Sequence, residues 1–259
     1  MYASNYFEAL MLNLMRSQSI TAPSKLYLGL YLSNPGDDGT SGTEISYTGY
    51  ERQEITFGVP TASGAGLMIS NSAMITFAQS PTSAGSVTHV AVFDAATGGN
   101  MYLYGQLDTA LSVQANVSPV FRVGSVSWLW SGNLNTYYRN AIMQTLRGTN
   151  CSGFAPYVAF FNGDPNGSGS EFSGNNYARS AVTMSNPEQQ ASGTAMSANS
   201  SDVISPVSTG SWGSFTHIAI MDASSAGNVF AAGPLGTSYV INNGYSVTIP
   251  AGALQVNVN

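Results

Sequence analysis

Two histidines stand at equivalent places of two similar segments, and each is followed by an aspartate five residues later. His89 and Asp94 belong to THVAVFDAATGGN, and His217 and Asp222 belong to THIAIMDASSAGN. Such a pair could act as a general base and its orienting carboxylate if the side chains lay within hydrogen-bonding reach. Five residues of extended strand, however, span about 16 Å. We therefore predict that each imidazole bonds a backbone group or a hydroxyl, and that each aspartate opens the following turn.

Metal ligands are scarce in this sequence. One histidine per segment supplies a single ligand, and Cys151 is the one cysteine, so neither a zinc site nor an intrachain disulfide is predicted. Two oxygen-rich loops remain as the alternative place for Ca²⁺. Their candidate ligands are Asp37, Asp38 and Glu44 in the first loop and Asp164, Asn166 and Glu171 in the second. Their spacing does not fit an EF-hand and their residues favour turns, so we predict no metal site and no cofactor.

Two arginines follow a tyrosine at the same spacing. Arg52 comes two residues after Tyr50, and Arg179 comes two residues after Tyr177, in a chain with 7 basic residues. An arginine kept at both places can clamp the chain through a bidentate pair with a carboxylate. The alternative is a solvated charge at a strand edge. We expect the structural clamp.

Motifs of known enzyme classes are missing from the sequence. It contains no G-x-S-x-G elbow, no P-loop, no dinucleotide fingerprint and no H-E-x-x-H. Asp108 and Glu188 are isolated acids without the pairing that glycoside hydrolysis requires. We therefore expect no enzyme, no catalytic residues and no cofactor-binding residues.

The composition excludes several partners. Charged residues make up 8% of the 259 residues, and 7 Lys and Arg stand against 13 Asp and Glu, so no basic surface for nucleic acid is expected. The first 19 residues read as a helix rather than a signal peptide, because they lack a basic start and a cleavage site. No run approaches the ~18 apolar residues of a membrane-spanning helix.

The chain repeats itself. Five segments of the first half recur in the same order in the second half, each 127 to 131 positions later. Order and spacing of this kind indicate a tandem duplication, with a junction close to WSGNLN at residues 130–135. We predict two domains, residues 1–132 and residues 133–259.

Each half is predicted to begin with one amphipathic helix and to continue as β structure. Apolar residues recur with helical spacing near residues 7–15 and 138–146, and Asn5, with Glu8 as its capping-box partner, and Asn135 are candidate N-caps. Short apolar strands separated by Gly, Asn and Ser follow. We therefore expect a mainly β fold of two tandem antiparallel β-sandwich or small-barrel domains, with residues 88–94 as a central strand covered by the helix.

The repeated pattern resembles a family of small virion domains of tailed bacteriophages, of the tail-fibre or tail-component type. The marks of the resemblance are the Asn34-Pro35-Gly36 turn, the Gly-Tyr-x-Arg element at Arg52 and the Thr-His-x-x-x-x-Asp element at His89. The second half keeps Asp164-Pro165 and Arg179 but lacks the glycine after the proline. The resemblance covers essentially the whole chain. It implies a virion structural protein that binds other virion proteins and copies of itself.

Three functions follow as hypotheses. The first is a non-enzymatic tail component: fibre, adaptor or baseplate protein. The second is a decoration or cement protein on the phage head. The third is a receptor-recognition protein that binds a host surface glycan through exposed aromatic residues, namely Tyr102, Tyr104, Trp128 and Trp130. Because Trp128 and Trp130 alternate near the junction, we expect them to pack between the domains instead.

Overall fold

The chain folds as two copies of one sequence of elements. The computed structural model describes residues 1–132 and 134–258, so the two boundary positions 133 and 259 of the expected second domain lie outside the described residues. The first copy contains β1 (Tyr2–Ala3), α1 (Asn5–Asn13), a 3₁₀ turn (Leu14–Arg16), β2 (Leu26–Tyr31), β3 (Gln53–Ile55), β4 (Thr61–Ser63), β5 (Gly66–Ser70), β6 (Ile75–Thr76), β7 (Gly85–Phe93), β8 (Met101–Val113), β9 (Val120–Phe121) and β10 (Ser127–Trp130). The second copy contains α2 (Thr136–Thr145), β11 (Tyr157–Phe161), β12 (Ser180–Ala181), β13 (Glu188–Gln189), β14 (Ala195–Ala198), β15 (Val203–Ile204), β16 (Gly213–Met221), β17 (Val229–Ile241), β18 (Thr248–Ile249) and β19 (Gln255–Val258).

A large antiparallel sheet forms most of each copy. Its strand order is β1-β8-β7-β2-β3 in the first copy and β12-β11-β16-β17 in the second. The strands that carry the two histidines, β7 and β16, are central in these sheets, as their apolar sequences predict. The expected mainly β, two-copy architecture is confirmed.

The helices begin at different kinds of cap. Asn135 caps α2, because its side chain accepts a hydrogen bond from the backbone N–H of Tyr137 at 2.8 Å. In the first copy the prediction that Asn5 is the N-cap is wrong. Ser4 is the cap and accepts from the N–H of Phe7, while Glu8 is buried.

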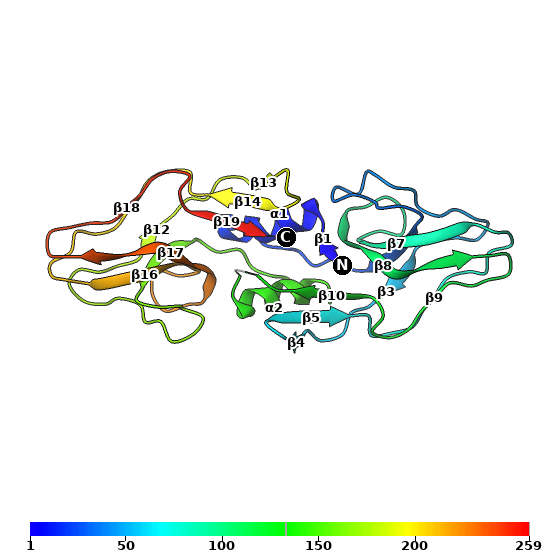
Figure 1. Cartoon of the computed structure of the whole chain (residues 1–259), viewed down its shortest axis with the longest axis horizontal. Coiled ribbons are helices and arrows are strands. Elements are labelled where there is room, and N and C mark those ends of the chain that lie inside the picture. Colours follow the sequence, from blue (N-terminus) through cyan, green and yellow to red (C-terminus); the bar gives the residue numbers. More distant parts are fainter. Residues whose placement is uncertain (133, 259) are drawn as a thin grey trace.

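Each helix packs on strands of both copies. Helix α1 packs on β14 and β19 of the second copy as well as on β1 and β8 of its own copy, and α2 packs on β5 of the first copy and β17 of its own. The small sheets that receive them have the orders β13-β14-β19 and β10-β5-β4. Figure 1 shows the result: an elongated molecule with the helices, small sheets and both termini in the middle and a large sheet towards each end.

A local two-fold relation ties the copies together. Ile20 and its counterpart Cys151 form an antiparallel bridge, with N···O distances of 2.8 and 3.0 Å. On one side of it Gly153 N–H donates to the hydroxyl of Ser19 at 3.1 Å. On the other side the equivalent positions repeat the contact, since Ala22 N–H donates to the side-chain oxygen of Asn150 at 2.9 Å. Each residue meets its own counterpart, which is the signature of an isologous contact.

The hydrophobic core is continuous through the molecule. One cluster of buried side chains extends from Ala3 to Val258 and includes Phe7, Trp128 and Tyr138. Trp128 and Trp130 are 1% and 4% exposed, and their rings stack with centroids 5.1 Å apart. Trp128 also lies 5.8 Å from Phe7 of α1, so both tryptophans belong to the buried core, and their packing between the two domains stays a prediction.

Candidate functional site

Arg52 clamps the large sheet of the first copy. Its Nε and Nη2 atoms donate to the two carboxylate oxygens of Glu44 at 2.9 and 2.8 Å, so the predicted bidentate pair is confirmed. Its Nη1 atom donates to the carbonyl oxygen of Gly98 at 2.8 Å, and the guanidinium lies 3.5 Å from the centre of the Phe93 ring. One side chain therefore ties the loop before β3 to the turn between β7 and β8.

Tyr50 completes this clamp. Its hydroxyl donates to Glu44 at 2.8 Å and accepts from the backbone N–H of Leu30 at 2.9 Å. Burial alone would raise the pKa of Glu44, but the hydrogen bonds from Arg52 and Tyr50 outweigh burial and hold that pKa below its usual value. The glutamate therefore stays ionised and paired.

The second copy repeats the hydrogen bonds of the clamp. Arg179 donates from Nε and Nη2 to Glu171 at 2.8 and 2.7 Å, and Tyr177 donates to the same carboxylate at 2.9 Å. Its Nη1 atom donates to the carbonyl oxygens of Ala223 and Ala226 at 2.7 and 2.6 Å. The sequence signal for the missing partner was the glutamate eight residues before the arginine in both copies.

Each histidine bonds the hydroxyl that precedes it. The Oγ1 atom of Thr88 lies 2.9 Å from Nδ1 of His89, and the equivalent distance from Thr216 to His217 is also 2.9 Å. Thr88 donates to the carbonyl oxygen of Leu32 at 2.9 Å, so its oxygen is free to accept from the imidazole Nδ1–H. Burial lowers the pKa of His89, which keeps this ring neutral. The predicted hydroxyl partner is confirmed.

Each aspartate closes the turn after the histidine strand. Asp94 accepts from the backbone N–H and the side-chain amide of Asn100 at 2.7 and 2.9 Å, and Asp222 accepts in the same way from Asn228 at 2.6 and 2.9 Å. Asp222 also accepts from the hydroxyl of Tyr138 in α2 at 2.8 Å. The predicted turn-forming role is confirmed, and in the second copy it also anchors the helix.

The oxygen-rich loops are used for turns and clamps. Glu44 and Glu171 are bound to arginines, and Asp38 accepts from the backbone N–H and hydroxyl of Thr40 at 3.0 and 2.7 Å. Asp164 accepts from Asn166 N–H at 2.8 Å. Within residues 1–132 and 134–258, no three His, Cys, Asp or Glu side chains converge as metal ligands would.

One carboxyl is buried at the contact between the copies. Glu8 of α1 is 1% exposed and lies near Gln189 and Ala195 of the second copy. Its Oε2 atom and the Oδ1 atom of neighbouring Asp37 are buried without a hydrogen-bond partner among the described residues. Burial, with the charge of Asp37, raises the pKa of Glu8 to about 8. A neutral Glu8 can donate a hydrogen bond that two ionised carboxylates cannot make.

The aromatic residues predicted as sugar platforms are not exposed. Tyr102, Trp128 and Trp130 are 2%, 1% and 4% exposed, and Tyr104 is half-buried between Tyr2 and a cluster on the outer face of the sheet. A sugar ring needs an open aromatic face, so this expectation is wrong for these residues.

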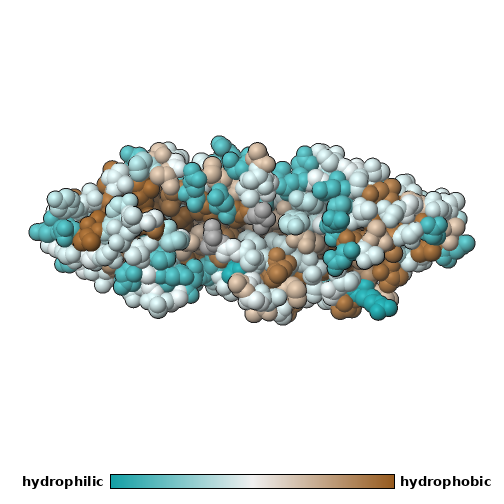
Figure 2. All heavy atoms as spheres, in the orientation of Figure 1, coloured by the Kyte–Doolittle hydropathy of each residue, from teal (hydrophilic) through white to brown (hydrophobic). Residues whose placement is uncertain are grey.

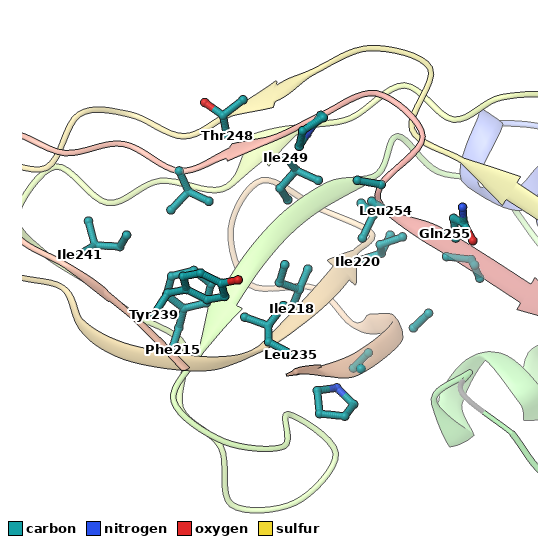
Figure 3. Close-up of a pocket in the computed structure, with 18 of the residues that line it drawn as sticks. Phe215, Ile218, Ile220, Leu235, Tyr239, Ile241, Thr248, Ile249, Leu254 and Gln255 are labelled. Atoms are coloured by element: carbon teal, nitrogen blue, oxygen red, sulfur yellow. The ribbon is translucent and has the colours of Figure 1, made fainter. Parts of the chain in front are cut away.

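An open apolar groove of about 610 Å³ lies in the second copy. It runs between the sheet strands β16 and β17 and the C-terminal segment 246–257. Figure 3 shows Ile218 and Leu235 of the sheet facing Ile249 and Leu254 of that segment. Among the described residues that line it there is no Asp, Glu, Lys or Arg. Neither charge patterning nor periodicity pointed to this groove.

Two clamps, two capped turns and a pair of helices that pack on both copies are scaffolding features, and they repeat in both halves of the chain. A family model described as podophage GP4 fiber I protein gp80 matches the chain twice, over residues 2–128 and 133–257. The chain belongs to this phage fibre family. It is therefore a virion protein with a tandem-duplicated fibre domain. No curated protein matches the chain. In the part of the chain that the structure describes, no helix is long and apolar enough to cross a membrane.

Proposed function

We propose that this fibre-family chain is a non-enzymatic component of the phage tail that acts by binding other virion proteins. The observation that carries the proposal is the double match of the fibre family over nearly the whole chain. The scarcity of charge supports it, since cores of protein interfaces are depleted in charged residues. The structural roles of the histidines, which bond the preceding threonine, and of the aspartates, which close turns, also support it, because neither pairs with the other among the described residues.

Copy number in purified virions tests the tail position. A tail component is expected at a small multiple of the tail symmetry, measured by quantitative mass spectrometry against the portal and major capsid proteins. A copy number that matches the capsid lattice would instead establish the head-decoration role and contradict this proposal.

A degradation assay tests the absence of enzymatic activity. Purified chain added to host capsule or lipopolysaccharide should leave turbidity and saccharide length unchanged over hours. Release of oligosaccharides would overturn the non-enzymatic assignment, and saturable binding without cleavage would support the glycan-receptor alternative. Self-association of the purified chain is expected and is measured by light scattering over a concentration series.

A further inference from the structure

The groove exists because the two copies differ at positions that fill the space between the sheets. In the first copy Met1 lies against Gly105 of β8, and its amino group donates to the carbonyl oxygen of Ser127 in β10 at 3.3 Å. Met1 thus fills the gap between the large sheet and β10, and it packs on the core. A residue of the chain itself closes the first copy at this place.

Among the residues that the structure describes, the second copy has a glycine instead of a long side chain at this place. Ala3 pairs with Leu103 and Leu134 pairs with Ala231, so Met1 corresponds to Gly132. Gly233 takes the place of Gly105, and an added Cβ on Gly233 would meet nothing within 4 Å. The space that Met1 fills in one copy is therefore open in the other.

A second difference widens the groove. Trp128 faces Ile69 in the small sheet of the first copy, and in the second copy the equivalent pair is Val256 and Ser197. An indole is thus replaced by an isopropyl group on one wall. In contrast, the Leu103 and Ala3 pair is replaced by Ala231 and Leu134, which only exchanges the large and the small partner. Volume is therefore lost at the positions of Met1, Trp128 and Ile69, which are Gly132, Val256 and Ser197 in the second copy.

We propose that the groove is the docking site for an uncharged, apolar segment of another virion protein. The inference rests on the proposed virion role. Met1 in the first copy shows the chemistry of the occupant, a long apolar side chain inserted between two sheets. A charged side chain would be desolvated among groove residues that offer no counter-charge.

The surroundings of the groove extend the apolar surface. Tyr239 lines the groove, stacks on Phe215 with ring centroids 5.7 Å apart and is 53% exposed. Ile204 pairs with Thr248 of the groove and is 61% exposed. Tyr245 directly precedes the segment 246–257 and is 65% exposed. Figure 2 shows hydrophobic residues on the surface of the half that holds the second copy, as well as on the other half. A groove opening onto exposed apolar residues is typical of a protein-binding surface.

A different protein fits the groove better than a second copy of this chain. A second copy of the chain bound about a two-fold axis that passes through the groove would place groove against groove, and two hollows cannot fill each other. A glycan also fits poorly, because aliphatic side chains dominate the lining and the two aromatic rings stack on one another. The occupant we infer is therefore a peptide segment that presents Met, Leu, Phe or Trp.

Photo-crosslinking in assembled virions tests the proposal. Leu235, which lines the groove, is replaced by a photoreactive phenylalanine analogue in the full chain, and the crosslinked peptides are sequenced. We expect an uncharged apolar segment of another virion protein. Crosslinks to a second copy of the chain, to a non-protein molecule, or only within the chain would overturn the proposal.

The second experiment fills the groove with an added side chain. Gly233→Met places in the second copy the side chain that Met1 supplies in the first, and it should lower the Leu235 crosslink to the partner at least about tenfold, or about 1.4 kcal/mol. Gly236→Leu is the control, because Gly236 lies on the same strand and also has open space around it but is outside the groove. It should leave the crosslink unchanged.

An undiminished crosslink in Gly233→Met would contradict the proposal. If Gly233→Met fails to fold, the wild-type crosslink at Leu235 decides alone. If the chain lies at the head and Leu235 crosslinks to a capsid protein, the tail assignment is refuted. The proposal that the groove binds another virion protein still stands in that case.

Discussion

At the scale of single residues, the arginine and glutamate pairs stabilise loops. The Arg52 and Glu44 side chains are 9% and 27% exposed, so their bidentate pair is mostly desolvated. Removing one partner of such a pair leaves a charge without its counter-ion. The cost should be large for a residue that looks, in the sequence, like an isolated surface arginine.

Arg52→Ala should lower the free energy of unfolding by roughly 2–4 kcal/mol, below the upper range for buried pairs because Glu44 is partly solvated. Arg52→Lys should recover little, since an ammonium group cannot reproduce the bidentate geometry. Urea denaturation measures both variants. Lys25→Ala is the matched control: its pair with Glu54, at 2.7 Å, is 55% and 46% exposed, so the change should leave the urea midpoint nearly unchanged. Equal losses for Arg52→Ala and Lys25→Ala would refute the clamp.

Glu8 should make stability fall as the pH rises. Its pKa is about 8 in the folded protein and near 4.5 when unfolded, so the folded state holds an extra proton between these values. Stability is therefore fully present below about pH 4.5 and is lost progressively towards pH 8, by an amount on the order of 2–4 kcal/mol. The pKa of Asp37 is also raised, mainly by burial, and it acts in the same direction at lower pH.

Glu8→Gln should flatten this pH dependence and stabilise the protein at pH 8, because a neutral amide removes the buried charge that would form near Asp37. The measurement is the urea midpoint between pH 5 and 9. Glu51→Gln changes an exposed carboxyl in the same half and serves as the control. If the urea midpoint of Glu8→Gln changed with pH as steeply as that of the wild type, the Glu8 carboxyl would not be the source of the pH dependence.

At the scale of elements, the sharing of helices makes the two copies one cooperative unit. Each helix is shared between its own large sheet and the small sheet of the other copy. Neither half can then unfold without exposing the partner's helix-binding surface. Although the repeat in the sequence divides the chain near residue 132, the packing does not divide there.

Met11→Ala should therefore destabilise both halves together. Met11 lies on the buried face of α1 and is 1% exposed, so its truncation should cost about 2–5 kcal/mol. Differential scanning calorimetry should show one transition, shifted to lower temperature, whose calorimetric and van't Hoff enthalpies agree. Two separate transitions, with the second half unaffected, would show that the sharing of helices does not couple the copies.

The elements that the sequence predicted are those whose pattern is local. Both helices and the central strands β7 and β16 were visible because apolar residues recur with the right period. The small sheets were missed. Strand β14 reads Ala-Met-Ser-Ala, without β-branched or aromatic residues, and its helical partner comes from the other half of the chain. No local pattern can report such a contact.

The candidate site was predictable to the same extent. The roles of His89 and Asp94 followed from strand geometry and local turn chemistry. The carboxylate that binds Arg52 was not identified, because Glu44 was considered as a cation ligand and its recurrence eight residues before the arginine in both copies was overlooked. The groove could not be foreseen at all, since it depends on Gly132 and Val256 standing where the other copy has Met1 and Trp128.

At the scale of the whole molecule, duplication gives a pseudo-symmetric body with one asymmetric feature. The two-fold contact at Ile20 and Cys151 and the repeated clamps are common to both copies, whereas the open groove is a feature of the second. A body of this kind can meet similar neighbours with its repeated surfaces and one distinct neighbour with the groove. Such a molecule suits a joint within a phage tail.

A cryo-electron microscopy reconstruction of the intact virion tests the central claim most directly. The account predicts that density for this elongated two-copy body lies in the tail, with a segment of another virion protein seated between β17 and residues 246–257. Density for the chain on the capsid lattice, with the groove open to solvent, would contradict it.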